Sequence, residues 1–184
     1  MYRLRQDGRA AVILPDGFLF GTDNTKVAIK KKLMNEFNLH TIIRMPGSVF
    51  SPYTSITTNI LFFDHTGSTK QTWFYRLDIP EGYKHFSKTK PMRTEHFDPV
   101  REWWGNRTEI VDGDGFKAKC YTASEFAESS YNLDLCGYPH EEEEILPPKE
   151  LIQEYQEKRA SLNANIDRIL EKITSILGID LKEE

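Results

Sequence analysis

The sequence predicts an α/β fold that ends in one long helix. Two observations predict the α/β part: a short continuous apolar run at residues 10–14, and a stretch of near-helical apolar spacing between it and the next β-branched run. The third observation is the recurrence of isoleucine and leucine every three, four or seven residues beyond Pro147. With 184 residues, 39% hydrophobic and 28% charged, the chain is long enough for one well-buried core plus an appendage.

The first predicted strand is residues 10–14. Its unbroken apolar run, closed by Pro15 and Gly17, is typical of a strand that is buried on both faces of a parallel sheet. A helix of about 13 residues follows, with Asp23 or Asn24 as its N-cap. Lysines fill the gaps between the apolar positions of this helix, as in a helix that packs on one face.

The next segments predict three further strands. The helix is expected to end near Asn38, and residues 40–46 form the second strand. Strand, helix and strand with short connections make a βαβ unit, whose two strands are expected to be parallel. Residues 55–65 and 71–79 predict the third and fourth strands, joined by a turn at Gly67. In the fourth strand, alternation places three side chains on one face: Trp73, Tyr75 and Leu77.

The rest of the chain divides into a weakly periodic segment and the long helix. Residues 81–140 predict loops with short helices laid over the sheet, including a helix start at Ser124 that stops at Asn132. The glutamates at 141–144 are typical of a solvated linker. The predicted parts are therefore an α/β sheet at 1–80, an irregular covering segment with an acidic linker at 81–146, and a helix at 147–180.

The predicted helix carries a stripe of large aliphatic residues. An exposed stripe of this length is an association surface, and the alternative is that the helix folds back on its own domain. Lys158 and Arg159 interrupt the stripe, so that only its regular part suits coiled-coil packing. The residues expected at a subunit interface are Leu162, Ile166, Ile169, Ile173 and Ile176.

The loop between the second and third strands has an unusual composition for a loop. In "TIIRMPGSVFSPYTSITTNILFF", residues 41–63, two strand-like runs flank Gly47, Phe50, Pro52 and Tyr53. The two rings either pack under the loop as local core or are held out to stack on something flat. The residue pattern alone leaves both interpretations open.

Charge and composition exclude several classes of protein. Residues 1–80 carry ten Lys and Arg against six Asp and Glu, a net charge of +4, whereas residues 81–184 carry a net charge of −8. Any contact with DNA is therefore expected in the first half. No apolar run is long enough for a membrane span and no signal-type stretch opens the sequence, so we expect a cytoplasmic protein. The two cysteines and five scattered histidines predict free thiols and no metal site.

The order of these motifs resembles the modification (M) subunits of type I restriction-modification systems, which are adenine-N6 DNA methyltransferases. The stretches that carry the resemblance are "GRAAVILPDGFLFG", "IKKKLMNEFNLHTIIRMPGSVFSPYTSITTNILFF", "SSYNLDLCGYP" and "ELIQEYQEKRASLNANIDRILEKI". The second is the most specific of them. Together they cover most of the chain, and they imply a partial Rossmann-like methyltransferase sheet, its last strands and crossover helix, followed by the long helix.

Two motifs of that family do not occur in these 184 residues. The family resemblance implies a glycine-rich turn for S-adenosylmethionine and a catalytic Asn-Pro-Pro-Phe/Tyr motif, whereas the only Pro-Pro here is Pro147-Pro148. We therefore expect the C-terminal portion of such a subunit, which begins at about the fifth sheet strand. It is expected to hold no catalytic residue, to bind no S-adenosylmethionine and to be inactive alone, although the parent protein is an enzyme that uses this cofactor.

The resemblance also implies roles for particular residues. Phe50 matches the position of the ring that stacks on the extruded target base, with packing as the alternative. Further possible DNA contacts are Gly47, Pro52, Tyr53, Lys30, Lys31 and Lys32. A local structural role is the alternative for Tyr53, and a solvated helix face is the alternative for the lysines.

The implied partners are the DNA-specificity subunit, a second modification subunit, the restriction subunit and double-stranded DNA. In the family, the terminal helices bundle with helices of the specificity subunit, which gives the aliphatic stripe its partner. The alternative function is a non-enzymatic module in which the helix mediates oligomerisation or interaction. If residues 10–14 normally pair with a further strand, we expect a contact along their free edge.

Overall fold

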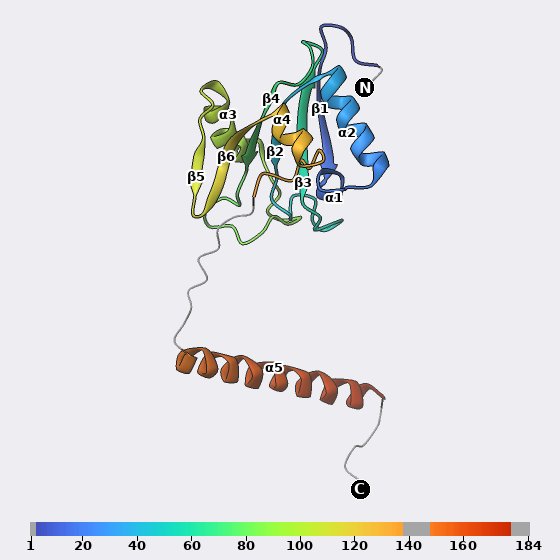
Figure 1. Cartoon of the computed structure of the whole chain (residues 1–184). Helices are drawn as coiled ribbons and strands as arrows, with labels where there is room; N and C mark the ends of the chain where they lie inside the picture. Colours follow the sequence, from blue (N-terminus) through green and yellow to red (C-terminus); the bar gives the residue numbers. More distant parts are fainter. Residues whose placement is uncertain (1–2, 138–147, 178–184) are drawn as a thin grey trace. The chain divides into compact units, whose positions relative to one another are not determined.

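The computed structural model describes residues 3–137 and 148–177. The chain forms two compact units, Met1–His140 and Glu141–Glu184, each of which is described by itself. The first contains a mixed sheet with helices on both faces, and the second contains one long helix (Figure 1).

The sheet of the first unit has six strands in the order β1-β3-β2-β4-β6-β5. Among these strands β2 and β4 are parallel neighbours, and the other four neighbouring pairs are antiparallel. The strands are β1 (Arg9–Pro15), β2 (Asn38–Arg44), β3 (Thr58–Asp64), β4 (Gln71–Arg76), β5 (Ile110–Asp112) and β6 (Gly115–Thr122).

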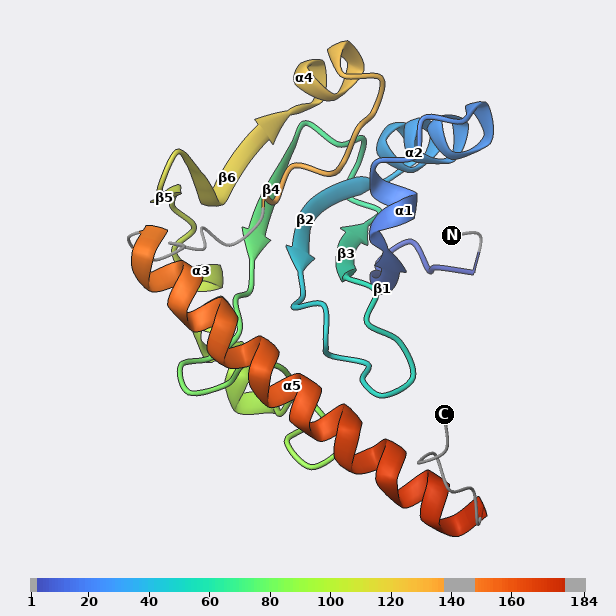
Figure 2. The same cartoon turned by 90° about the horizontal axis from the view of Figure 1, so that it is seen from below.

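Helices cover both faces of this sheet, as the end-on view in Figure 2 shows. One face carries α1 (Asp16–Leu19), α2 (Asn24–Glu36) and α4 (Ala123–Glu128), and the other carries the short 3-10 helix η1 (Thr94–Phe97) with α3 (Asp98–Gly105). The first layer holds the larger core, which includes Leu33, Ile42, Leu61, Phe74 and Phe126. The second holds Ile43, Tyr75, Leu77, Val100 and Trp103.

The predicted helix after the first strand is confirmed. Helix α2 has 13 residues, and the side chain of its N-cap, Asp23, accepts a hydrogen bond of 2.9 Å from the backbone N–H of Lys26. Its C-cap is Phe37, one residue before the predicted Asn38. Strands β2, β3 and β4 lie within two or three residues of their predicted bounds, and Trp73, Tyr75 and Leu77 share the second core as the alternation predicts.

The prediction that the first strand is buried between parallel neighbours is wrong. β1 lies at the end of the sheet and pairs antiparallel with β3, so that Val12 and Ile13 are 38% and 50% exposed. β1 and β2 do run in the same direction, since both are antiparallel to β3, but β3 is inserted between them. An apolar run does not reveal which strand will lie beside it. The predicted contact along the free edge of β1 stays a prediction.

The prediction of loops and short helices for residues 81–140 misses a hairpin. β5 and β6 extend the sheet beyond β4, joined through a turn in which Gly113 has a φ of +57°, a conformation that glycine adopts without a steric penalty. Lysines and a cysteine interrupt the apolar pattern of β6, which obscured it in the sequence. The predicted short helix near Ser124 is α4, which ends at Glu128.

The second unit contains α5 (Pro148–Leu177), which confirms the predicted long helix over the residues that the structure describes. Residues 147 and 178–180 of the predicted range, and the acidic run 141–144, lie outside the described residues. The predicted stripe falls within an arc of roughly 80° at 100° per residue, and its side chains are 45–83% exposed. No helix in residues 3–137 or 148–177 is both long enough and apolar enough to span a membrane.

Candidate functional site

The aromatic loop lies at the edge of the sheet where three strands end. β1, β2 and β4 run in the same direction, so their carboxyl ends meet at one edge, and β3 begins there (Figure 1). Residues 45–57 join β2 to β3 at this edge. In open α/β sheets, ligands bind outside the carboxyl ends of the strands. The loop therefore occupies the position at which a ligand is expected.

Backbone and side-chain hydrogen bonds hold this loop. At its base the N–H of Met45 donates to the carbonyl of Thr58 at 2.9 Å, and in its first half the hydroxyl of Ser48 accepts from the N–H of Phe86 at 2.8 Å. A Cβ on Gly47 would lie 3.1 Å from the hydroxyl of Thr57, so glycine allows the two arms of the loop to approach closely. The loop is thus a constrained structure, although it lies at the surface.

Three large apolar side chains of the loop reach solvent. Phe50 is 37% exposed, Ile56 is 57% exposed and Tyr53 is 93% exposed. Tyr53 therefore does not pack as local core: its structural contribution is a backbone hydrogen bond of 2.9 Å to the carbonyl of Phe50. Pro52, which follows a cis peptide bond, is also exposed. The loop presents two aromatic rings, Phe50 and Tyr53, of which the family resemblance implies a stacking role for Phe50.

A buried ion-pair network fixes the residues just before the loop. Arg44, the last residue of β2, is 3% exposed and lies beside two carboxylates, 3.3 Å from Asp16 and closer to Asp134. It also donates to the carbonyl of Gly137 at 2.7 Å, while the amide of Asn59 donates to Asp16. Burial alone would lower the pKa of Arg44, but the neighbouring Cys136 and the two carboxylates together overcome this effect and raise it.

A second buried arginine lies beside the first. Arg76 ends β4 and is in register with Arg44 across the parallel pair. Its guanidinium is paired with Asp78 at 2.7 Å and with Asp112, and these carboxylates raise its pKa against the opposing effect of burial. Sequence analysis missed both networks, because their signal is only a polar residue at the end of each strand, and the partners come from distant segments.

The prediction that Lys30 meets DNA phosphates or lies on a solvated helix face is wrong. Lys30 is completely buried, and its ammonium donates at 2.9 Å to the carbonyls of Leu19 and Gly21. Burial lowers its pKa, and Asp23 partly opposes that shift. Lys30 therefore ties α2 to the turn after α1. Lys31 and Lys32 are exposed, and their contact with DNA stays a prediction.

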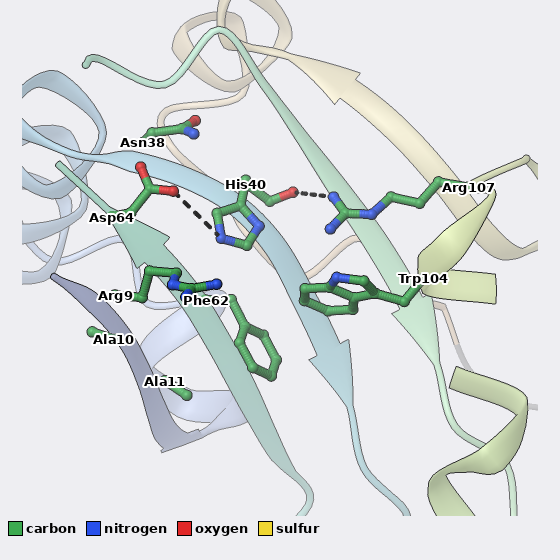
Figure 3. Close-up of a pocket in the computed structure, with 9 residues that line it drawn as sticks. All are labelled: Arg9, Ala10, Ala11, Asn38, His40, Phe62, Asp64, Trp104 and Arg107. Atoms are coloured by element: carbon green, nitrogen blue, oxygen red, sulfur yellow. Dashed lines mark hydrogen bonds and ion pairs between the residues drawn. The ribbon is translucent and has the colours of Figure 1, made fainter. Parts of the chain in front are cut away.

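A second polar site lies at the opposite edge of the sheet, where β1 and β2 begin and β3 ends. A groove of about 620 Å³ is lined by Arg9, Asn38, His40, Phe62, Asp64, Trp104 and Arg107, with Ala10 and Ala11 at its side (Figure 3). His40 lies 3.9 Å from Asp64, and burial, with a smaller effect of Arg107, lowers the pKa of its imidazole. In the described residues, no three His, Cys, Asp or Glu side chains are placed to hold a metal ion.

Comparison with known proteins gives consistent matches. The family model described as N-6 DNA Methylase matches residues 1–145. The type I restriction enzyme EcoEI methylase subunit of Escherichia coli is 42% identical over 181 residues, which are 97% of this chain and 36% of that protein. The chain thus spans little more than a third of that relative.

Two solved structures are similar in fold. A crystal structure of a modification subunit of a putative type I restriction enzyme from Vibrio vulnificus YJ016 is 44% identical, with a TM-score of 0.59 over 71% of this chain and 27% of that one. A structure concerned with complex assembly and conformational transition of the type I R-M system is 27% identical, with a TM-score of 0.61 over 93% of this chain and 37% of that one.

Proposed function

The chain belongs to the N-6 DNA methylase family, and from this premise we propose that it forms the target-base end of an adenine-N6 DNA methyltransferase of the type I restriction-modification class. The observation that carries the proposal is the constrained loop 45–57, which presents Phe50 and Tyr53 at the carboxyl ends of the strands. In this proposal, strands β1 to β4 and helix α2 are the last part of a Rossmann-like methyltransferase sheet. The substrate is adenine in double-stranded DNA.

S-adenosylmethionine is the methyl donor that the family implies, and the described residues do not fit it. The carboxylate directly after β1, that of Asp16 in α1, accepts hydrogen bonds from Arg44 and Asn59, and β1 runs directly into α1 without a glycine-rich turn. We therefore assign the cofactor site to other residues of the parent enzyme and derive no step through it.

The role of the loop is to hold the target base after it leaves the double helix. An enzyme that modifies a base within DNA must extrude it, and stacking on an aromatic ring contributes about 1–3 kcal/mol per base. Phe50 is the proposed stacking residue, and its partial burial fixes the ring while leaving a face accessible. Tyr53 offers a second ring, and Gly47 and Pro52 shape the loop around them. The amine of adenine stays free for transfer, because stacking engages only the face of the base.

The partners follow from the helix. We propose that α5 presents its aliphatic stripe to the DNA-specificity subunit, beside the helix of a second modification subunit, and that the restriction subunit joins the same assembly. The stripe is Leu162, Ile166, Ile169, Ile173 and Ile176, all of which are 45–83% exposed in α5. An aliphatic surface of this length is stable in water when another apolar surface covers it.

Substitution of Phe50 in the assembled enzyme tests the proposal. The enzyme is expressed in a host without adenine methylation, and N6-methyladenine is mapped across the genome. Phe50→Ala is expected to lower the methylation rate by about 5- to 150-fold, the equivalent of one lost stacking contact. Phe50→Trp keeps a ring and is expected to retain most activity. Phe50→Leu is the matched control, because it keeps apolar volume without a ring: full activity in Phe50→Leu would show that Phe50 only packs.

The exposed stripe also favours a second candidate, a non-enzymatic interaction module that oligomerises through α5. Ile166→Asp with Ile173→Asp places two charges within the stripe, while Ala160→Asp with Ala164→Asp places two charges on the opposite side of the helix. If the proposed function holds, the isoleucine double variant loses the specificity subunit in a pull-down and the alanine control keeps it. If instead the isoleucine double variant loses a homo-oligomer and binding of the specificity subunit is unchanged, the result favours the interaction module.

A further inference from the structure

Two buried arginines and the half-buried Arg107 differ in their partners. Arg44 and Arg76 each contact two carboxylates. Arg107 contacts no carboxylate within 4 Å in the part of the chain that the structure describes. Its guanidinium lies 4.4 Å from the ring centre of Trp104 and 3.5 Å from the carbonyl oxygen of His40.

This environment is costly for a cation. Burial lowers the pKa of Arg107, in contrast to the raised values of the two paired arginines. A half-buried guanidinium that contacts no carboxylate gains a favourable interaction when an anion binds. The side chain is nonetheless held in place, since the Trp103 indole N–H donates at 2.9 Å to the carbonyl of Thr108 and so fixes the turn that carries Arg107.

The groove around Arg107 has the size and charge for such an anion. Cavities of about 620 Å³ and about 510 Å³ share Asn38, His40 and Arg107, and sites for small ligands usually measure about 300–1,000 Å³. Figure 3 shows Arg9 and Arg107 reaching toward His40 from opposite sides, and Lys70 lines the second cavity.

The acidic residue of the groove is already engaged. The carboxylate of Asp64 accepts hydrogen bonds from the backbone N–H of Thr66 at 3.0 Å and from its hydroxyl at 2.5 Å, and it faces His40. The negative charge of Asp64 is thus partly balanced by Thr66 and His40. The lining is net positive, with Arg9, Arg107 and Lys70 against Asp64.

We propose that this groove binds a phosphate group, with Arg107 and Arg9 as its ligands and the rings of Phe62 and Trp104 as an apolar wall. Two guanidiniums on opposite sides suit a tetrahedral group whose oxygens point in several directions, whereas a planar carboxylate is held best by one. The phosphate belongs either to a free nucleotide or to a DNA backbone. The site lies at the edge of the sheet opposite the aromatic loop, so it does not depend on the proposed function.

Intrinsic tryptophan fluorescence of the full 184-residue chain tests the proposal. The three tryptophans, Trp73, Trp103 and Trp104, all line these cavities or lie beneath Arg107, so a bound ligand changes their emission. The probes are inorganic phosphate, adenosine 5′-monophosphate and a short DNA duplex. Saturable quenching that weakens with added salt is expected for at least one of them.

Variants assign the binding to the groove. Arg107→Ala is expected to weaken binding by about tenfold or more, and Arg9→Ala, an exposed position on the edge strand, by a few fold. Arg168→Ala removes the same charge from α5 and is expected to change nothing. If Arg107→Ala lowers the midpoint of thermal unfolding, its loss of binding could reflect lost stability. Binding is then compared in Arg9→Ala and in Arg107→Lys, which keeps the charge but not the planar guanidinium.

The outcomes distinguish the two sources of phosphate. Binding of adenosine 5′-monophosphate or inorganic phosphate that depends on Arg107 supports a free ligand, and binding of the duplex alone with the same dependence supports the DNA backbone. Equal affinity in wild type, Arg107→Ala and Arg9→Ala overturns the proposal. So does duplex binding that is lost in Phe50→Ala but kept in Arg107→Ala, because the DNA then lies at the aromatic loop. Equally tight binding of acetate overturns the choice of phosphate.

Discussion

Replacing Arg44 by methionine removes the guanidinium that holds two strand ends and the start of the aromatic loop together. The side chain is 3% exposed, and its carboxylate partners, Asp16 and Asp134, are 14% and 18% exposed. Removing one partner of a buried ion pair costs about 3–5 kcal/mol, because the other charge stays buried. Since both carboxylates keep some contact with water, we expect the lower end, about 3 kcal/mol. For a unit of this size that corresponds to a fall in the thermal midpoint of roughly 10 °C.

Urea denaturation followed by tryptophan fluorescence measures the unfolding of the compact unit that contains Arg44, because all three tryptophans lie in Met1–His140. The control is Arg101→Met, whose pair with Asp98 has a distance of 2.6 Å but is more than half exposed on both sides, so that it contributes about 0–1 kcal/mol. Adding Asp16→Asn and Asp134→Asn to Arg44→Met is expected to recover part of the loss. A cost below 1 kcal/mol for Arg44→Met alone would refute the reasoning.

Three further predictions concern buried groups. Lys30→Met removes the Lys30 donor from the buried carbonyl of Gly21 and leaves the carbonyl of Leu19 with only the N–H of Leu133, so it is expected to cost about 1–3 kcal/mol in urea denaturation; a neutral effect would mean that water replaces the ammonium. Burial raises the pKa of the Cys136 thiol to about 12, so a thiol reagent at pH 8 is expected to modify the partly exposed Cys120 first and Cys136 only on unfolding. Burial lowers the pKa of His40 below the unfolded value of about 6.5, so the unfolded state binds more protons and stability falls as pH drops below that value. His40→Gln is expected to flatten this slope in denaturation series, and an unchanged slope contradicts the assignment.

The elements that sequence predicted well are those whose signal is local. Helix α2 has an N-cap and an apolar face within a short stretch of sequence, and the structure reproduces both, with the C-cap one residue before its predicted position. The alternation of β4 likewise needs no knowledge of its neighbours. The position of β1 was mispredicted for the opposite reason. An apolar run reports that a strand is buried somewhere, whereas its place in the sheet depends on β3, which comes more than 40 residues later.

In the candidate site too, features with a local sequence signal were predicted, and features that depend on distant residues were missed. The aromatic loop was visible because Phe50 and Tyr53 are unusual in a loop, and its place at the strand ends follows from the order of β2 and β3. The burial of Lys30 was not visible, since a lysine in a run of three reads as solvated until its ammonium is seen against two carbonyls. Arg107 was missed because its significance lies in the absence of a carboxylate within 4 Å among the described residues.

The two edges of the sheet differ in how their positive charges are balanced, and this difference favours different ligands. At the loop edge, Arg44 and Arg76 are each neutralised by carboxylates, so their main effect is to hold the strand ends rigid, and in the proposed function recognition there falls to the exposed rings. Aromatic stacking needs such a fixed frame, because a ring that moves freely loses conformational entropy on binding. At the opposite edge, Arg107 has rings and a carbonyl around it but no anion among the described residues, so recognition there is electrostatic. The salt dependence of small-ligand binding therefore separates the edges: binding of uncharged adenine at the loop is expected to be nearly insensitive to salt, and binding of inorganic phosphate at Arg107 strongly sensitive.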